Sequence, residues 1–137
     1  MGEAAFFVWD PNTLSVHVDS MDGEHQKLIK MMNGLHERHV AGDADRAELA
    51  RLLDEFAAFV VEHFTHEERY MASIDYPDLG KHKKVHENLL ERFATMRQEF
   101  DAGDGTLPDS LFQFLKFWLS AHIRGVDAKY GHHAPVR

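Results

Sequence analysis

The fold of this protein is decided by residues 63–86, which read HFTHEERYMASIDYPDLGKHKKVH. The stretch contains two pairs of residues of metal-binding type, His63 with Glu67 and His82 with His86, each four positions apart. In an α-helix, residues four apart lie on the same face and about 6 Å apart along the axis. Each pair can therefore reach one small object.

The residues between the two pairs interrupt the helix. Residues 73–80 read SIDYPDLG, and the proline and glycine in this segment disfavour a continuous helix. The pairs are therefore predicted to lie on consecutive helices folded against each other, with four ligand-type side chains face to face. For either pair alone, a solvated helix face is the alternative interpretation.

Composition limits the classes of site and partner. The chain has 137 residues, of which 44% are hydrophobic, and this predicts one soluble globular domain. It has no cysteine, so disulfides and thiolate metal sites are excluded and any metal must be held by nitrogen and oxygen. The net charge of -8 argues against nucleic acid and anionic lipid as partners. The N-terminus lacks a basic leader and a long apolar run, so we expect a cytoplasmic protein without membrane insertion. We also expect a monomer.

Four amphipathic segments follow an N-terminal arm, and turn residues separate them. We expect one domain, with an extended arm at 1–18, an antiparallel up-down-up-down four-helix bundle at 19–127 and a tail at 128–137. The arm would be anchored by Phe6, Phe7, Val8 and Trp9. The first helix would be capped by Asp19 or Ser20 and end at Gly42, the second capped by Asp43 or Asp45, the third run from Pro77 or Asp78 to about Gly103, and the fourth have Pro108 in its first turn.

The bundle topology brings the candidate ligands together. His25 lies near the start of the first helix, His63 and Glu67 near the end of the second, His82 and His86 near the start of the third, and His122 near the end of the fourth. When helix directions alternate, these four places are at the same end of the bundle. The six side chains are therefore predicted to meet at one depth in the core.

Asp127 is a further candidate, but helical spacing alone does not place it. It follows His122 by five residues, an offset of about 140° on an ideal helix, so the two side chains would diverge. A departure from helical geometry at Gly125 would be needed to bring Asp127 to the same site.

Several motifs together resemble the hemerythrin family, and specifically its single-domain bacterial members. They are D-x-x-H at Asp22 to His25, H-F-x-x-E-E at His63 to Glu68, Tyr76-Pro77 before His82 and His86, and W-L-x-x-H-I-x-x-x-D at Trp118 to Asp127. The match covers nearly the whole chain. It departs from the family at Glu24, where glutamine is frequent.

The resemblance implies reversible O2 binding at a non-haem di-iron centre with an oxo or hydroxo bridge, and small anions as ligands of the oxidised form. By this likeness His82, His86 and His122 would bind one iron, His25 and His63 the other, and Glu67 and Asp127 would bridge them. The iron with two histidines would keep the open coordination position. An apolar wall around that position would come from Leu28, Phe64, Trp118, Leu119 and Ile123, for which ordinary core packing is an equally weighted alternative role.

Other functions remain open at this stage. A ferritin-like enzyme is disfavoured because the chain has no Glu-x-x-His pair, and a zinc protease because it has no His-Glu-x-x-His. An O2 or redox sensor, and peroxide or nitric oxide chemistry at the same centre, remain alternatives to an O2 carrier that is not an enzyme. The remaining histidines are assigned structural or solvated roles: His17, His36, His39, His66, His132 and His133.

Overall fold

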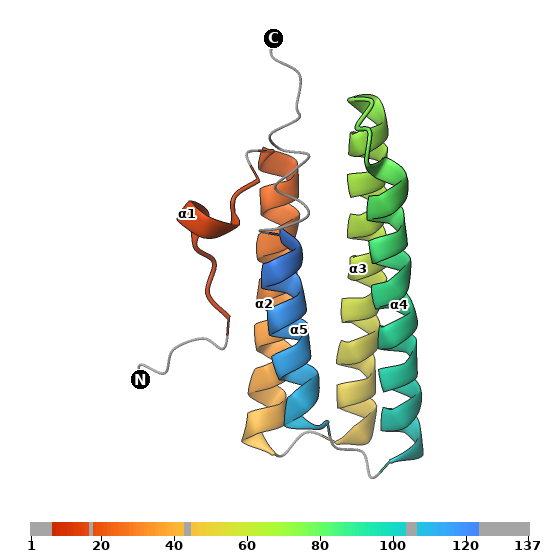
Figure 1. The fold of residues 1–137 in the computed structure, drawn as a ribbon. Helices are drawn as coiled ribbons and strands as arrows, with labels where there is room; N and C mark the ends of the chain where they lie inside the picture. Colours follow the sequence, from red (N-terminus) through yellow and green to blue (C-terminus); the bar gives the residue numbers. More distant parts are fainter. Residues whose placement is uncertain (1–6, 17, 43–44, 104–106, 124–137) are drawn as a thin grey trace.

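The structure is a computed structural model, and it describes residues 7–16, 18–42, 45–103 and 107–123. Within these ranges the chain forms helices and no strand, and the four long helices run alternately up and down (Figure 1). The predicted all-α antiparallel bundle is therefore confirmed. The helices are α1 (Pro11–Leu14), α2 (Asp19–Ala41), α3 (Arg46–Ser73), α4 (Leu79–Ala102) and α5 (Asp109–His122).

The described part of the N-terminal arm, residues 7–16, lies beside α2 and contains the single helical turn of α1 (Figure 1). Two hydrogen bonds fasten it: the Phe7 backbone N–H donates to Asn33 Oδ1, and Asn33 Nδ2 donates to the Phe7 carbonyl, both at 2.8 Å. Phe7 is buried and Trp9 packs half-buried on the core, as expected for anchors. Val8 is 63% exposed, so its predicted anchoring role is wrong, because neighbouring residues of an extended chain point to opposite sides. Phe6 lies outside the described residues.

The start of α2 differs from the prediction. Asp19 is already the first helical residue, and neither it nor Ser20 is the N-cap. Val18 occupies that position without a side-chain cap bond. The carboxylate of Asp22 in the first turn instead accepts a 2.8 Å hydrogen bond from the Val16 backbone N–H. This bond joins the arm to α2 close to the predicted ligand end.

The link between α2 and α3 begins and ends at residues that the sequence predicted. Gly42 ends α2 in the left-handed region, with φ of 73°, where glycine is favoured because it has no Cβ. Asp45 caps α3, and its side chain accepts a 2.8 Å hydrogen bond from the Glu48 backbone N–H. The other candidate cap, Asp43, lies outside the described residues.

The turn between α3 and α4 is set by the end of α3. Asp75 has φ of 52°, a left-handed conformation that aspartate tolerates better than most residues. The Tyr76 N–H donates to the Met71 carbonyl at 2.9 Å, and the Asp75 N–H donates to the Ala72 carbonyl at 3.2 Å. These bonds have the pattern of a Schellman motif, which satisfies the last carbonyls of a helix.

The remaining ends agree closely with the sequence. Asp78 precedes α4 and Gly103 follows it. Pro108 is the residue immediately before α5 and not within its first turn, a shift of one position. None of the helices in the described ranges is both long and apolar enough to cross a bilayer.

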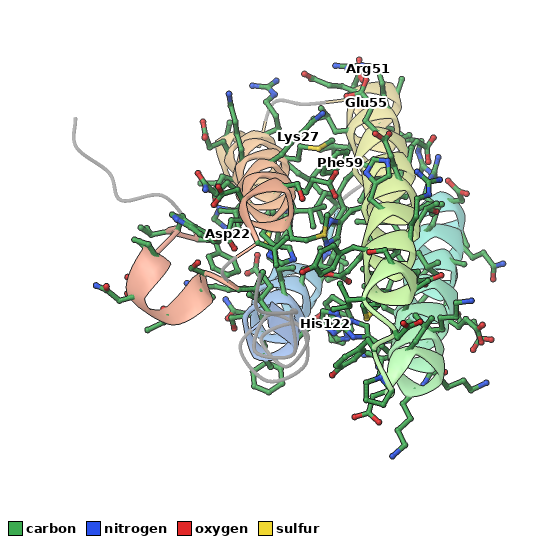
Figure 2. The ribbon with its side chains drawn as sticks, turned by 90° about the horizontal axis from the view of Figure 1, so that it is seen from above. Asp22, Lys27, Arg51, Glu55, Phe59 and His122 are labelled. Atoms are coloured by element: carbon green, nitrogen blue, oxygen red, sulfur yellow. The ribbon has the colours of Figure 1, made fainter. Side chains whose placement is uncertain are left out.

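Side chains fill the space between the helix pairs that Figure 1 shows as ribbons (Figure 2). The predicted apolar stripes supply this core, because residues three and four apart on each helix face inward. Met32, Leu35, Phe112 and Ile123 are among its fully buried members.

Candidate metal centre

Six of the seven predicted ligands meet at the end of the bundle where α2 begins and α5 ends. His25 lies in the second turn of α2, and His122 is the last residue of α5. All six side chains belong to residues that are at most 4% exposed. They are His25, His63, Glu67, His82, His86 and His122, and the seventh, Asp127, lies outside the described residues.

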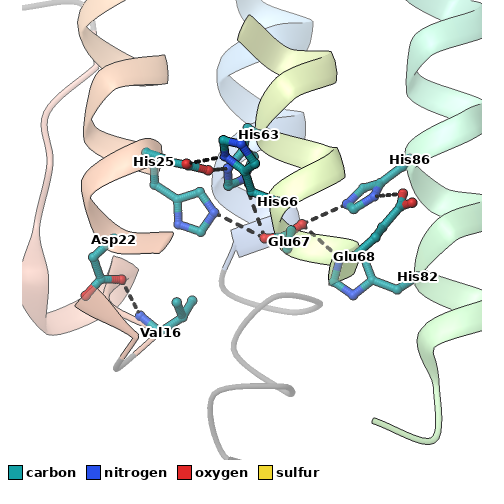
Figure 3. Close-up of polar contacts among 10 residues, drawn as sticks. Val16, Asp22, His25, His63, His66, Glu67, Glu68, His82 and His86 are labelled. Atoms are coloured by element: carbon teal, nitrogen blue, oxygen red, sulfur yellow. Dashed lines mark hydrogen bonds and ion pairs between the residues drawn. The ribbon is translucent and has the colours of Figure 1, made fainter. Parts of the chain in front are cut away.

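Glu67 lies at the middle of this cluster, and its two oxygens face different histidines (Figure 3). Oε2 is 3.5 Å from Nε2 of His25 and 3.5 Å from Nε2 of His63. Oε1 is 3.4 Å from Nε2 of His82 and 2.8 Å from Nε2 of His86. The carboxylate thus separates the imidazoles of α2 and α3 from those of α4.

The ligand atoms form two groups that share Glu67. One group comprises His25, His63 and Glu67, and the other comprises Glu67, His82, His86 and His122. Within each group the ligand atoms all lie within 4.8 Å of one another. Two cations with one carboxylate between them match this arrangement.

The residues present fit the di-iron centre that the resemblance implies. Imidazole and carboxylate suit a first-row transition metal, and two ions account for more ligands than a single octahedral ion can hold. Three of the four distances from Nε2 to Glu67 exceed the roughly 2.7–3.2 Å of ordinary N–H···O bonds. Direct hydrogen bonding therefore explains this geometry less well than coordination around ions would.

Electrostatics inside the cluster favour the charged form of Glu67. Burial alone would raise the pKa of its carboxyl, but the imidazoles of His25, His63, His82 and His86 together hold that pKa well below the ordinary value of 4.5. Glu67 is therefore an anion in the protein interior, as a bridging ligand must be.

A second carboxylate contacts the outer nitrogen of a candidate ligand on each side of the cluster. Glu68 Oε2 is 2.9 Å from Nδ1 of His86. Glu24 Oε1 is 2.6 Å from Nδ1 of His63, and Glu24 Oε2 is 2.6 Å from Nδ1 of His66. A carboxylate that accepts from Nδ1–H leaves Nε2 to face the metal and makes it a better ligand.

The pKa of Glu24 reflects these contacts. Partial burial would raise it, but the hydrogen bonds to His63 and His66 outweigh burial and lower the pKa below the ordinary value of 4.5. Glu24 is therefore ionised at neutral pH and accepts hydrogen bonds through both oxygens.

Reasoning from the sequence assigned no functional role to Glu24 or Glu68. Both are neighbours of predicted ligands, and their helical offset of about 100° places them beside the inward face and not on it. Adjacency to a ligand was the available signal. It could not reveal which imidazole each carboxylate contacts, because the contacts of Glu24 join α2 to α3 and the contact of Glu68 joins α3 to α4.

Aromatic side chains stack on two candidate ligands. The Phe64 ring lies parallel to that of His86, with centroids 3.7 Å apart and an interplanar angle of 6°. Trp118 stacks on His122 at 4.4 Å and 12°. These flat contacts restrict rotation of both imidazoles and cover them with apolar surface.

A small apolar cavity adjoins the cluster. Its volume is about 30 Å³, and His63 and His122 form part of its wall. Of the five predicted pocket residues, four line the cavity, namely Leu28, Phe64, Trp118 and Leu119. Ile123 is fully buried but does not line it. The cavity is large enough for one small molecule.

The histidines that were assigned structural or solvated roles lie outside the two ligand groups where the structure describes them. At the far end of α2, His39 pairs with Asp109 at 2.8 Å, and His36 packs edge-on against Phe112. His66 contacts Glu24. The other three, His17, His132 and His133, lie outside the described residues.

The profile of a family described as the hemerythrin HHE cation binding domain matches residues 16–133. The chain belongs to the hemerythrin family. Its relatives include a bacteriohemerythrin of Stenotrophomonas maltophilia (strain R551-3), 36% identical over 92% of this chain and 80% of that protein. A myohemerythrin of Riftia pachyptila is 34% identical over 90% of each chain.

Solved hemerythrin structures share the fold. A wild-type hemerythrin has a TM-score of 0.85 and 31% identity, covering 93% of this chain and 97% of that one. A hemerythrin mutant in which alanine replaces a leucine has a TM-score of 0.88 and 29% identity, covering 97% of this chain and all of the other. The hemerythrin likeness thus extends through the whole bundle.

Proposed function

We propose that this hemerythrin binds O2 reversibly at a di-iron centre. The observation that carries the proposal is the position of Glu67, a buried carboxylate whose two oxygens face two separate sets of imidazoles beside an apolar cavity. The iron pair, when bound, would supply an open coordination position and the two electrons that O2 takes up on binding and gives back on release. The rest of the function falls to the protein's own side chains.

The ligand residues would hold the two ions in unequal surroundings. We assign His82, His86 and His122 to one ion, His25 and His63 to the other, and Glu67 to both. Asp127 is proposed as the second bridge on the strength of the family motif. The cavity is lined by His63 from the side with fewer histidines and by His122 from the other side. It therefore adjoins both sets of ligands, and the open position is assigned to the His63 side from the division of histidines.

The cavity wall keeps water and protons from this side. Leu28, Phe64, Trp118 and Leu119 present carbon atoms to the space next to His63, and they offer no proton donor except the indole N–H. Reversible binding would depend on such a wall, because water or protons that reached the bound O2 would convert it to a product that cannot leave as O2. This favours a carrier or store of O2 and not an enzyme.

The spectrum of the protein tests the proposal directly. We expect the reduced, iron-loaded protein to gain visible absorption in air and to lose it under argon over repeated cycles. Colour that appears once and does not reverse would contradict reversible binding and favour peroxide or nitric oxide chemistry. An O2 or redox sensor would also cycle, so that role needs a partner whose binding changes with O2.

Metal and anion analysis test the ligand assignment. We expect two irons per chain after reconstitution, and one azide bound per iron pair in the oxidised form. One metal per chain, or zinc retained in full after iron reconstitution, would contradict the di-iron centre. Two equivalent azide sites would contradict the unequal division of histidines. The single domain of residues 1–137 and its cytoplasmic location stay predictions.

A further inference from the structure

Glu24 contacts two histidines, and only one of them, His63, is a candidate metal ligand. Glu24 on α2 reaches α3 at two places, with Oε1 2.6 Å from Nδ1 of His63 and Oε2 2.6 Å from Nδ1 of His66. Both distances are short for nitrogen–oxygen contacts, as expected of hydrogen bonds to a charged acceptor. The side chain of His66 is 36% exposed, whereas that of His63 is 2% exposed. The three residues thus connect the buried centre with the surface.

The chemistry of position 24 determines which tautomers its partners can adopt. A carboxylate accepts hydrogen bonds through both oxygens, so His63 and His66 can both carry the proton on Nδ1. A glutamine in the same pose would offer one acceptor and one donor. It would therefore require one of the two imidazoles to present an unprotonated Nδ1. The carboxylate of Glu24 can thus accept a hydrogen bond from Nδ1–H of His66 while it also accepts one from His63.

The pair also restricts movement. A carboxylate held by one hydrogen bond can rotate about its last torsion, but one held at both oxygens cannot rotate without breaking a bond. The imidazole of His63 is consequently held in one plane, with Nε2 directed at Glu67 Oε2 over 3.5 Å. His66 contributes to this arrangement although it does not face the centre itself.

We propose that His66 is a positioning residue of the metal centre, acting through Glu24 to keep His63 in the Nδ1–H tautomer with Nε2 turned toward the metal. The proposal rests on the proposed function in that Nε2 of His63 is taken as a ligand. A purely structural role is the alternative, in which the contacts of Glu24 only tie α2 to α3 and contribute to folding stability.

The metal-free protein provides the first test. Long-range proton–nitrogen NMR of ¹⁵N-labelled histidine should show Nδ1–H tautomers for both His63 and His66. In His66→Leu the His63 imidazole should become a mixture of tautomers, whereas His66→Asn should keep the native signal, because the asparagine amide can donate to Glu24 from nearly the same place. A native His63 protonated on Nε2 would overturn the proposal even if a variant failed to fold.

Metal affinity provides the second test, with Co²⁺ as the only added ion. His66→Leu should weaken one of the two Co²⁺ sites by about 10-fold, the lower end of the effect of losing an outer partner. His66→Asn should bind as the native protein does. Thr65→Ala, at an exposed position one residue away on α3, is the matched control and should also bind normally.

The outcomes separate the two proposals. Native affinity at both sites in His66→Leu, with a lower melting temperature alone, would establish the structural role and overturn the positioning role. Equal weakening in His66→Leu and His66→Asn would overturn it too, since the donor would not matter. Failure of the native protein to take up two Co²⁺ would instead count against the di-iron centre.

Discussion

Glu67 shows how one side chain is stabilised by groups from several helices. Glu67 is fully buried, and burial by itself would favour protonation of its carboxylate. Four imidazoles from α2, α3 and α4 nevertheless surround the carboxylate and lower its pKa. Without metal, this arrangement retains a buried anion only while the surrounding imidazoles stabilise it. The charge state of Glu67 is therefore linked to folding.

We expect the metal-free protein to lose stability in acid partly through Glu67. Its pKa is lowered in the folded state, so its contribution is fully present above the ordinary value of 4.5 and is lost as pH falls below 4.5 toward the folded pKa. Thermal unfolding of native protein and Glu67→Gln across the acid range measures this. The melting temperatures of the two proteins should change in parallel above that value, and the native protein alone should show the additional loss below it. Parallel curves throughout would contradict the lowered pKa.

Substitutions at Leu28 can distinguish a role in core packing from a role in protecting bound O2. It is 2% exposed and lines the cavity beside His63. Leu28→Val should cost on the order of 1 kcal/mol of folding free energy and leave autoxidation nearly unchanged. Leu28→Glu should admit water and speed autoxidation of the oxygenated protein.

Autoxidation rates of folded variants with matched iron content decide this question. Ile123→Asn is an informative companion, because Ile123 is buried but does not line the cavity. It should destabilise the fold and affect autoxidation less than Leu28→Glu. A native autoxidation rate in Leu28→Glu would mean that the wall does not protect bound O2.

The helix ends are set by local chemistry that acts far from the centre. Gly42 and Asp45 lie at the opposite end of the bundle from the ligand cluster, where α2 stops and α3 starts (Figure 1). Their role is to set the length and phase of each helix, which in turn decides how far along the axis each ligand lies. Substitutions at these positions should therefore lower folding stability more than they affect the metal centre.

Asp45→Ala should lower stability by about 1 kcal/mol, because it removes the acceptor for the Glu48 backbone N–H at 2.8 Å. Asp45→Asn retains a side-chain oxygen and should cost only a small part of this. Denaturant unfolding of the metal-free protein measures both variants. Equal losses in the two would mean that the charge of Asp45 near the helix N-terminus matters more than its hydrogen bond.

We expect bound metals to stabilise the bundle as a whole. Candidate ligands from four helices meet at one end, so bound ions would hold α2, α3, α4 and α5 together. Ions that bind the folded chain more tightly than the unfolded one stabilise it, by about 2.7 kcal/mol when the free ion is at 100 times its dissociation constant.

Removing the metals should therefore lower the melting temperature by several degrees. Calorimetry of iron-loaded and chelator-treated protein measures the difference, and Asp45→Ala is the control, since it should lower both forms by similar amounts. Equal melting temperatures for the two forms of the native protein would contradict coupling between the metals and the fold. Loss of the difference in Glu67→Ala would support its place between both ions.

The sequence by itself determined the four long helices, their order and the end of the bundle at which His25, His63, Glu67, His82, His86 and His122 gather. This was predictable because helical period, caps and turn residues act locally, and alternating direction then follows from the short connections. It could not determine that Val8 faces outward or that the start of α2 has no side-chain cap. Nor could it determine that Asp22 accepts a hydrogen bond from the arm, or that Glu24 bridges His63 and His66. These features depend on the rotation of each helix about its axis and on contacts between helices, which only the packing of the whole core decides.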